Sequence, residues 1–264
     1  MRELRLASNN YLKLYLRSYY LRAIIVFISV VMSGFVWGQT FLPCTNSGEI
    51  ITHTNYSLSY CEKHEQAEWV YYWLTPDRIL GDAKRNDRFK EDPDVFTGSS
   101  KLSDYKGSGF DRGHLCPAAD NKNSDITMAE SFYMSNMSPQ LPAFNRGIWK
   151  QLEEQFRVWA LDSEGLYVVT AGILSDSLHT IGVTQVSIPQ YFYKIAYSPK
   201  KNSMIAFMME NKKLDQPLDA YVVSVDSIEK ITHLDFFPQL EDDLEERLES
   251  TIVLEDWGII KKEE

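Results

Sequence analysis

Basic residues are scarce in this chain relative to acidic ones. Its 264 residues include 27 lysines and arginines against 37 aspartates and glutamates, so the formal net charge is −10. A chain this acidic is not expected to coat nucleic acid loosely through charge alone. The composition still leaves room for a local basic groove, in particular one that a divalent cation completes.

Linkers and repeats are absent from the sequence. No internal repeat, low-complexity run or segment rich in Pro, Gly or Ser divides residues 45–260. Hydrophobic residues make up 44% of the chain and aromatic residues 13%, which argues against wholesale disorder. We therefore expect a single domain over residues 39–264.

The N-terminus differs from the rest of the chain. Five basic residues precede the apolar run Ala23–Gly38, an order that is typical of an export signal. Residues 1–38 are therefore expected to be a signal peptide cleaved before Gln39, with an uncleaved N-terminal membrane anchor over residues 23–38 as the alternative. Cleavage would remove five basic residues and one acidic residue and take the net charge from −10 to −14. The expected location is the periplasm or the medium.

Cysteines are few, and export would permit them to pair. Of the three, Cys44 and Cys61 would close a short loop and stabilise the fold by about 3 kcal/mol if the geometry allows. Cys116 would then stay unpaired, two residues after His114.

The apolar segments predict an α+β domain. Four runs are rich in apolar or β-favouring residues and are expected to be strands: 66–74, 165–174, 190–198 and 203–210. A helix is expected after Phe144, because apolar residues follow at steps of four, four and three. These four strands and this helix favour a central, mainly antiparallel sheet flanked by helices.

A second helix is expected over Leu240–Ser250, with leucines four residues apart. We interpret its many charges as a solvated face and not as a site.

Two further patterns are weak candidates for sites. Cys61 and His64 have the spacing of half a zinc site, but no second half follows. The acidic run 82–94 lacks the glycine and terminal glutamate of a calcium loop, so a charged loop is expected there. The histidines His53, His64, His179 and His233 are expected to be surface or hydrogen-bonded core residues.

The stretch "SGFDRGHLCPAAD" concentrates chemistry in four successive positions. Asp111, Arg112, Gly113 and His114 stand side by side. An uncharged imidazole, with an unperturbed pKa near ~6.5, is able to take a proton from water at neutral pH. Gly113 is expected to let the backbone pass close to a substrate or metal, to adopt a positive φ, or to serve an ordinary turn.

Downstream of His114, the sequence supplies oxygen ligands. Asn145 alone could cap the helix that starts there. Asn145 and Glu153 are eight positions apart, so on a helix they point within about 80° of each other and lie about 12 Å apart along the axis. One ion does not easily take both directly, but Glu153 leans back toward the helix start and could hold waters around an ion bound by Asn145. Magnesium, which sheds water reluctantly, binds in this way in many proteins.

Taken together, these motifs resemble the DNA/RNA non-specific endonucleases, which are ββα-metal (His-Me finger) nucleases. The resemblance rests on "DRGHLCPAAD", "SNMSPQ", "FNRGIWKQLE" and "YVVTAGIL", with further blocks in the same order over roughly residues 50–250. It implies a ββα-metal fold and a metal-dependent, sugar-non-specific endonuclease.

The resemblance also implies roles for individual residues. His114 matches the general base and Asn145 the direct metal ligand. Glu153 matches the acid that fixes metal-bound water, and Asn136 matches an asparagine that supports the site. An upstream arginine is implied to contact phosphate; Arg85 and Arg88 are both candidates, and the spacing to Phe89 favours Arg85. Arg112 is expected to brace the motif or the phosphate.

The implied reaction is hydrolysis of DNA and RNA by water, with products that end in 5′-phosphate. Mg²⁺ is the expected cofactor, with Mn²⁺ or another divalent cation as the alternative, and would stabilise the leaving 3′ oxygen. DNA and RNA are the expected partners, a membrane is a partner only if the leader is uncleaved, and an inhibitor protein stays an open question. Two other functions compete: a non-catalytic nucleic-acid-binding module on the same fold, and a metal phosphodiesterase for small substrates.

Overall fold

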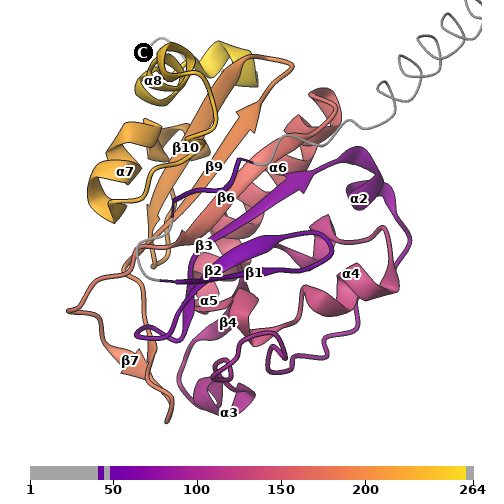
Figure 1. Ribbon diagram of the computed structural model, residues 1–264, viewed down its shortest axis with the longest axis vertical. Helices are drawn as coiled ribbons and strands as arrows, with labels where there is room; N and C mark the ends of the chain where they lie inside the picture. The colour runs from indigo at the N-terminus through magenta and orange to yellow at the C-terminus, as the bar shows by residue number, and fades with distance from the viewer. Residues whose placement is uncertain (1–40, 45–47, 260–264) are drawn as a thin grey trace, which may run out of the picture. The chain divides into compact units, whose positions relative to one another are not determined.

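The computed structural model describes residues 41–44 and 48–259, and the predicted leader, residues 1–38, lies outside them. The chain forms a central sheet of seven strands in the order β1-β2-β3-β6-β9-β10-β11 (Figure 1), and each neighbouring pair runs antiparallel. The strands are β1 (Glu49–Thr52), β2 (Ser57–Cys61), β3 (Gln66–Leu74), β6 (Leu166–Gly172), β9 (Tyr191–Ser198), β10 (Ser203–Glu210) and β11 (Val222–Val223). The prediction of an α+β fold with a mainly antiparallel sheet is therefore confirmed.

Two small sheets stand beside the central one. In the first, β4 (Asp111–His114) pairs with β5 (Met137–Gln140), and in the second, β7 (Thr180–Ile181) pairs with β8 (Val186–Ser187). Neither sheet was predicted, because strands of two to four residues are too short to show a period of two.

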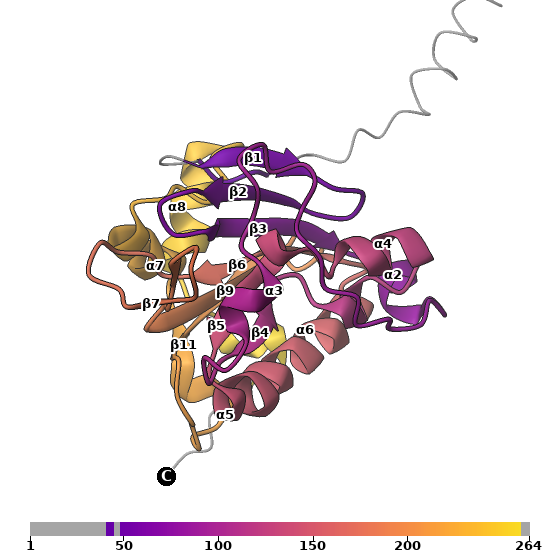
Figure 2. The same ribbon diagram turned by 90° about the horizontal axis from the view of Figure 1, so that it is seen from below.

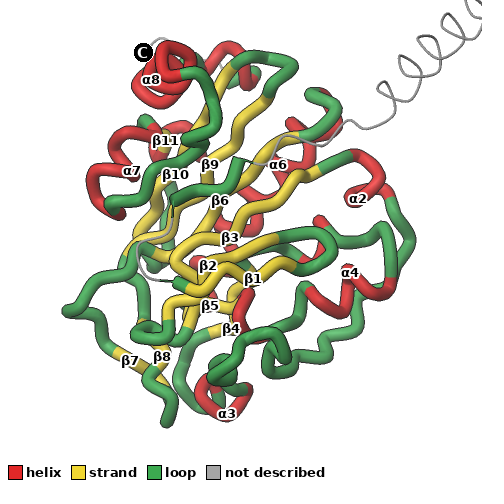
Figure 3. The backbone as a smooth tube through the Cα atoms, viewed as in Figure 1, coloured by secondary structure: helices red, strands yellow, loops and turns green. Residues whose placement is uncertain are grey.

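Helices and helical turns connect and cover the strands. The α-helices are α2 (Pro76–Leu80), α3 (Leu102–Tyr105), α4 (Asp125–Glu130), α5 (Pro142–Phe144), α6 (Lys150–Asp162), α7 (Val225–Thr232) and α8 (Asp242–Ser250). The short turns are η1 (Ala118–Asp120), η2 (Met134–Asn136), the π-helical η3 (Asn145–Trp149), η4 (Leu218–Tyr221) and η5 (Leu254–Trp257). The connection from α2 to α3 is a long irregular segment (Figure 3) that contains the predicted charged loop. None of the helices in the described ranges is long and apolar enough to cross a membrane.

The central sheet is covered on both faces, which explains its continuous apolar strands. On one face, Leu152, Phe156 and Trp159 of α6 pack with Val70 and Tyr72 of β3. On the other face, residues from α7 and α8 pack with alternate residues of the same strands (Figure 2). We call these the α6 face and the α7–α8 face. The buried stripe predicted for the helix after Phe144 is confirmed, since Ile148, Leu152, Phe156 and Trp159 are all buried.

The helix predicted over Leu240–Ser250 is present as α8, and its leucines pack against the α7–α8 face. Its charges do not all face solvent. Glu249 is buried, so the interpretation of these charges as a solvated face is wrong at this position.

Candidate active site

His114 lies at the end of β4, opposite Met137 of β5. Gly113, the residue before His114, explains how closely β4 and β5 approach each other next to the histidine. A Cβ added at Gly113 would lie 2.1 Å from Oε1 of Gln140, and the φ of Gly113 is not positive. Glycine is therefore required by the contact with Gln140, and not by a positive φ as one expectation had it.

The imidazole of His114 sits among aromatic rings and is held in its neutral form. The rings of Phe132 and Phe89 have centroids 5.0 and 5.7 Å from it. Its Nε2 is buried and has no hydrogen-bond partner among the described residues. Burial, together with the nearby positive charge of Arg85, lowers the pKa of His114 to about 3. The ring is therefore uncharged at neutral pH, and Nε2 is available to accept a proton.

Asn145 is held by Asp111, the first residue of the same β4 strand. The Asn145 Nδ2 donates to Oδ2 of Asp111 at 3.0 Å, while Arg146 donates to both oxygens of Asp111 at 2.8 and 2.6 Å. Burial alone would raise the pKa of Asp111, but the hydrogen bonds from Arg146 and Asn145 lower it, so the carboxylate is ionised. Because Asn145 has helical φ and ψ of −56° and −47°, it continues α5 into η3 and is not the N-cap of the helix that follows.

This arrangement suits a metal ligand. With Nδ2 turned to Asp111, the carbonyl oxygen Oδ1 of Asn145 is left without a hydrogen bond among the described residues. Carbonyl and carboxylate oxygens are the donors that magnesium prefers.

Glu153 supplies a carboxylate from the first turn of α6, where Lys194 of β9 acts on it electrostatically. Burial raises the pKa of Glu153 to about 7, against the opposite effect of the ammonium of Lys194. Lys194 itself is fully buried, and its Nζ lies 5.4 Å from the ring centre of Trp149 and 3.4 Å from the carbonyl oxygen of Leu115. Burial lowers the pKa of Lys194, against the opposite effect of the negative charges of Glu153 and Asp120. Lys194 therefore interacts both with Glu153 and, through Leu115, with the backbone next to His114.

Asn136 supports the segment that follows His114 and does not reach the cavity. Its Nδ2 donates to the carbonyl oxygens of Cys116 and Ser131 at 2.9 Å each, and its Oδ1 accepts from the backbone N–H of Cys116 at 2.8 Å. The side chain is fully buried. Its hydrogen bonds fix the path of the backbone just after the histidine, which is a positioning role.

The predicted site residues other than Asn136 meet at one cavity of about 390 Å³. Its lining residues are Arg85, Arg112, His114, Pro117, Ala118, Ala119, Asn145, Arg146, Lys150, Glu153 and Arg157. Four arginines and one lysine face a single acidic residue, although the whole chain carries a net charge of −10. The cavity is therefore a local basic groove suited to an anionic substrate.

Between the two arginine candidates, the structure places only Arg85 on this cavity. Its Nε pairs with Asp87 at 2.7 Å, and its guanidinium lies over the ring of Phe132 at 5.1 Å. Arg112 stacks on Phe89 at 4.2 Å. Stacking holds each guanidinium in place while its N–H groups stay able to bind phosphate.

Sequence reasoning did not assign roles to several residues that the structure brings to this site. They are Asp111, Arg146, Lys150, Arg157 and Lys194. Asp111 was visible in the motif, and the pair Glu153 and Arg157 shows helical spacing. No local signal marks Lys194, because it lies inside an ordinary apolar strand.

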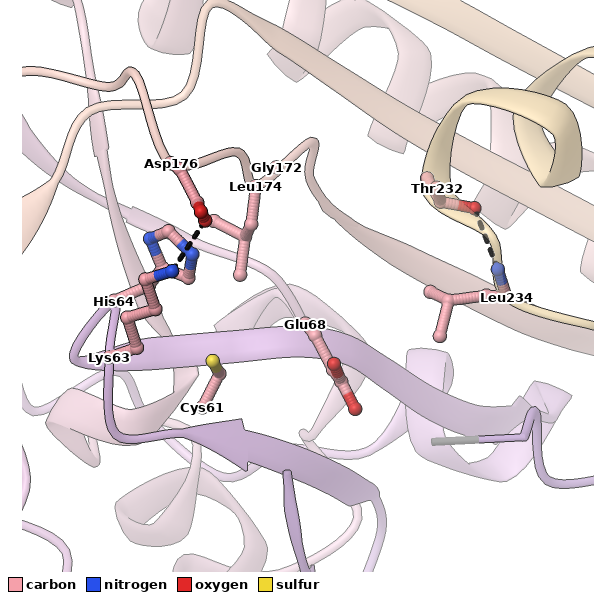
Figure 4. Close-up of a pocket in the computed structure, with 9 residues that line it drawn as sticks. All are labelled: Cys61, Lys63, His64, Glu68, Gly172, Leu174, Asp176, Thr232 and Leu234. Atoms are coloured by element: carbon pink, nitrogen blue, oxygen red, sulfur yellow. Dashed lines mark hydrogen bonds and ion pairs between the residues drawn. The ribbon is translucent and has the colours of Figure 1, made fainter. Parts of the chain in front are cut away.

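A second, smaller cavity lies away from His114 and includes the weak zinc candidate (Figure 4). It has a volume of about 200 Å³ and is bordered by the ion pair of Lys63 with Asp176, at 2.5 Å. The His64 Nδ1 is hydrogen-bonded to Oγ of Ser187 at 2.8 Å. His64 is thus a hydrogen-bonded core histidine, as expected.

The predicted disulfide between Cys44 and Cys61 is not formed. Cys44 is an exposed free thiol, and its Sγ lies 4.0 Å from Oδ2 of Asp235. The backbone places Cys44 beside the segment after α7, where its N–H donates to the carbonyl oxygen of Asp235, and this position decides against the pairing.

The family model of the DNA/RNA non-specific endonucleases matches residues 39–243. The chain belongs to this family. The prediction of a metal-dependent nuclease family is confirmed with it.

Two relatives and one solved structure show how far the similarity extends. The mitochondrial nuclease EXOG of Mus musculus is 35% identical over 209 residues, which cover 72% of this chain and 57% of that protein. Nuclease C1 of Cunninghamella echinulata var. echinulata is 36% identical over 212 residues, 73% of this chain and 84% of that protein. The crystal structure of endonuclease G in complex with EndoGI matches with a TM-score of 0.68 at 28% identity, over 74% of this chain and 88% of that one. The chain therefore spans little more than half the length of EXOG.

The comparisons correct the predicted location. Relatives matched here, EXOG and endonuclease G, are mitochondrial nucleases by name. The prediction of export to the periplasm or medium, which depended on residues 1–38, is wrong by this comparison.

Proposed function

We propose that residues 39–264 form a single domain that acts as a metal-dependent, sugar-non-specific endonuclease on the phosphodiester bonds of DNA and RNA. The observation that carries this proposal is the basic cavity, on whose walls His114, Asn145 and Glu153 meet. A neutral imidazole, an amide oxygen and a carboxylate among five cationic side chains match the needs of phosphodiester hydrolysis. Family membership supports the same reaction.

In this proposal, His114 is the general base. Its uncharged ring and unpartnered Nε2 support proton abstraction from a water molecule that attacks phosphorus. The free protein holds His114 as a weaker base than the unperturbed imidazole, because burial and Arg85 disfavour its protonated form. An anionic phosphate in the cavity raises the proton affinity of the ring again.

Asn145 and Glu153 would hold the metal ion, Mg²⁺ in first place and Mn²⁺ or another divalent cation as the alternative. Asn145 supplies the direct oxygen ligand, which Asp111 orients, and Glu153 holds water around the ion. When bound, the ion supplies Lewis-acid stabilisation of the negative charge on the leaving 3′ oxygen.

The arginines would bind the substrate backbone. Arg85 and Arg112 reach the cavity from two different segments and can donate paired N–H groups to one phosphate. Phosphate contacts carry no base information, so little sequence preference is expected. Attack by water, without use of a ribose 2′-OH, implies that DNA and RNA are both cut to products ending in 5′-phosphate. The structural similarity to an endonuclease G bound to its inhibitor also supports an inhibitor protein as a partner.

Gel digestion of plasmid DNA, single-stranded DNA and RNA, with Mg²⁺ and with a chelator, tests the proposal. Wild-type protein should degrade all three substrates with Mg²⁺ and none with chelator, and His114→Ala should lower the rate by at least ~100-fold. Binding without cleavage in Mg²⁺, Mn²⁺ and Ca²⁺ would instead favour the binding module. Cleavage of a chromogenic diester but not of long duplex DNA would favour the small-substrate enzyme.

A further inference from the structure

Helices α7 and α8 bring four acidic residues together on the face of the sheet that α6 does not cover (Figure 1). Asp226 and Glu229 are three residues apart on α7, and Glu245 and Glu249 are four apart on α8, so each pair shares one helix face. The two helices pack against each other, with Leu248 of α8 buried beside them. We call these four residues the α7–α8 acidic cluster.

Three carboxylates of this cluster converge closely. One oxygen each from Asp226, Glu229 and Glu249 lies within 4.8 Å of the other two. Two oxygens on opposite sides of one Ca²⁺ ion, each at about 2.4 Å from it, are also separated by about 4.8 Å. The spacing therefore fits a single shared cation. Glu229 also accepts the backbone N–H of Phe236 at 2.7 Å through Oε1, which fixes its side chain.

Burial of these carboxylates lowers the stability of the fold unless a positive charge lies beside them. Glu249 is only 5% exposed, and its Oε1 is buried with no hydrogen-bond partner among the described residues. The Oε1 of Glu245 is also buried and has no hydrogen-bond partner among the described residues. A buried carboxylate oxygen without a partner loses its hydration and gains nothing in return. Glu249 also stands in the last turn of α8, where the helix dipole disfavours negative charge.

The charged neighbours of Glu249 do not compensate for the loss of hydration of its carboxylate. Burial, followed by the negative charges of Glu229, Glu245 and Asp226, raises the pKa of Glu249 to about 9. Asp235 acts in the same direction. The carboxylates of the cluster therefore repel one another, and a bound cation among them would relieve that repulsion.

Another acidic group in the molecule shows the contrast. His53, Asp92 and Asp94 also converge within 4.8 Å. Asp92 accepts hydrogen bonds from Nε2 of His53, from the hydroxyl of Ser135 and from the backbone N–H of Asp94. That group is satisfied by its own hydrogen bonds, whereas the α7–α8 acidic cluster is not.

We propose that the α7–α8 acidic cluster binds a hard divalent cation, with Ca²⁺ as the preferred ion, through Asp226, Glu229 and Glu249. The ion ties α7 to α8 and, through them, to the sheet. Because the nuclease cavity lies with α6 and its surroundings, this site is separate from catalysis. Carboxylates and water are the ligands that Ca²⁺ selects, and the flexible coordination of Ca²⁺ suits three side chains from two helices.

Calorimetric titration with CaCl2 tests the proposal on the full chain in which Asn145→Ala removes the other candidate metal ligand. This background variant should bind one Ca²⁺ per chain, and its thermal unfolding should shift to higher temperature with Ca²⁺. Adding Glu249→Gln should weaken Ca²⁺ binding at least roughly tenfold, since one charged ligand becomes a neutral one. Asp226→Asn, at an exposed position, should act in the same direction and guards against a folding defect of the buried change.

Glu246→Gln provides the matched control, because Glu246 is an exposed acid on the same helix and outside the cluster. It should leave Ca²⁺ binding unchanged. The proposal is overturned if the background variant binds no Ca²⁺. In that case, a Glu249→Gln protein that is more stable to unfolding than the background variant would show that protons neutralise the cluster. It is equally overturned if Glu249→Gln and Asp226→Asn bind Ca²⁺ as the control does. Neither result depends on nuclease activity.

Discussion

Replacement of Asp111 by alanine tests whether the orientation of Asn145 matters for the metal. Asp111 accepts one hydrogen bond from Asn145 and two from Arg146. A hydrogen bond to a charged group contributes about 1.5–3 kcal/mol, and each ~1.4 kcal/mol is a factor of ten in an equilibrium constant. The loss of the Asn145 contact should therefore weaken metal binding by about 10- to 100-fold, which is also the scale for residues that orient a metal ligand.

The assay is the initial rate of plasmid cleavage over a titration of MgCl2. Asp111→Ala should shift the half-saturating Mg²⁺ concentration upward by that factor and recover much of its rate at high Mg²⁺. Asp111→Asn keeps an acceptor oxygen without the charge and should lie between Asp111→Ala and the wild type. Protein unfolding by urea, measured in parallel, should show that both variants are folded.

Arg146→Ala separates the two contacts of Asp111. The Arg146 side chain is 72% exposed, so its ion pair contributes little to holding Asp111 in place. This variant should raise the KM for DNA, because the guanidinium lines the cavity, while the Mg²⁺ requirement stays near that of the wild type. A shift in Mg²⁺ dependence as large as that of Asp111→Ala, or an unchanged Mg²⁺ titration in Asp111→Ala, would refute the reasoning.

Three other predictions concern residues that line the basic cavity. Arg85→Ala should raise the KM for DNA by roughly tenfold or more, on the scale of a lost charge-assisted hydrogen bond. Arg88→Ala, at an exposed position off the cavity, should change the KM less than about twofold. Steady-state kinetics of both variants measure this, and equal effects on the KM would contradict the choice of Arg85. Because the pKa of His114 is lowered to about 3, the neutral ring persists as the pH falls from 7 to 5, and the pH profile of kcat/KM should show no step from this residue there. The stability consequence has a definite sign: the unfolded chain binds a proton to His114 below about pH 6.5 and the folded chain does not, so stability decreases as the pH falls from there toward 3. Acid unfolding of His114→Phe should begin at a lower pH than that of the wild type, and an identical onset would argue against the buried neutral ring.

Much of the fold was predictable from local sequence. The strands Gln66–Leu74 and Ser203–Glu210 were predicted at their observed bounds, because long apolar runs ending at polar residues are strong signals. The helix after Phe144 was predicted from its spacing, but no local pattern indicates that the turn before α6, η3, is π-helical with Gly147 outside the helical region. Short strands such as β4 and β5 were not predicted, because they form strands by pairing with each other and their composition does not indicate it.

What the sequence by itself determined is the family, the α+β sheet and the choice of His114, Asn145 and Glu153 as candidate site residues, since motif and periodicity are local properties of the chain. Only the tertiary structure decided how these residues are supported: Asp111 turns the amide of Asn145, the buried Lys194 interacts electrostatically with Glu153, and Arg85 lines the cavity while Arg88 does not. The same holds for the free thiol of Cys44 and for the burial of Glu249. Burial, charge proximity and hydrogen bonding join residues that are far apart in sequence, so no spacing along the chain reveals them.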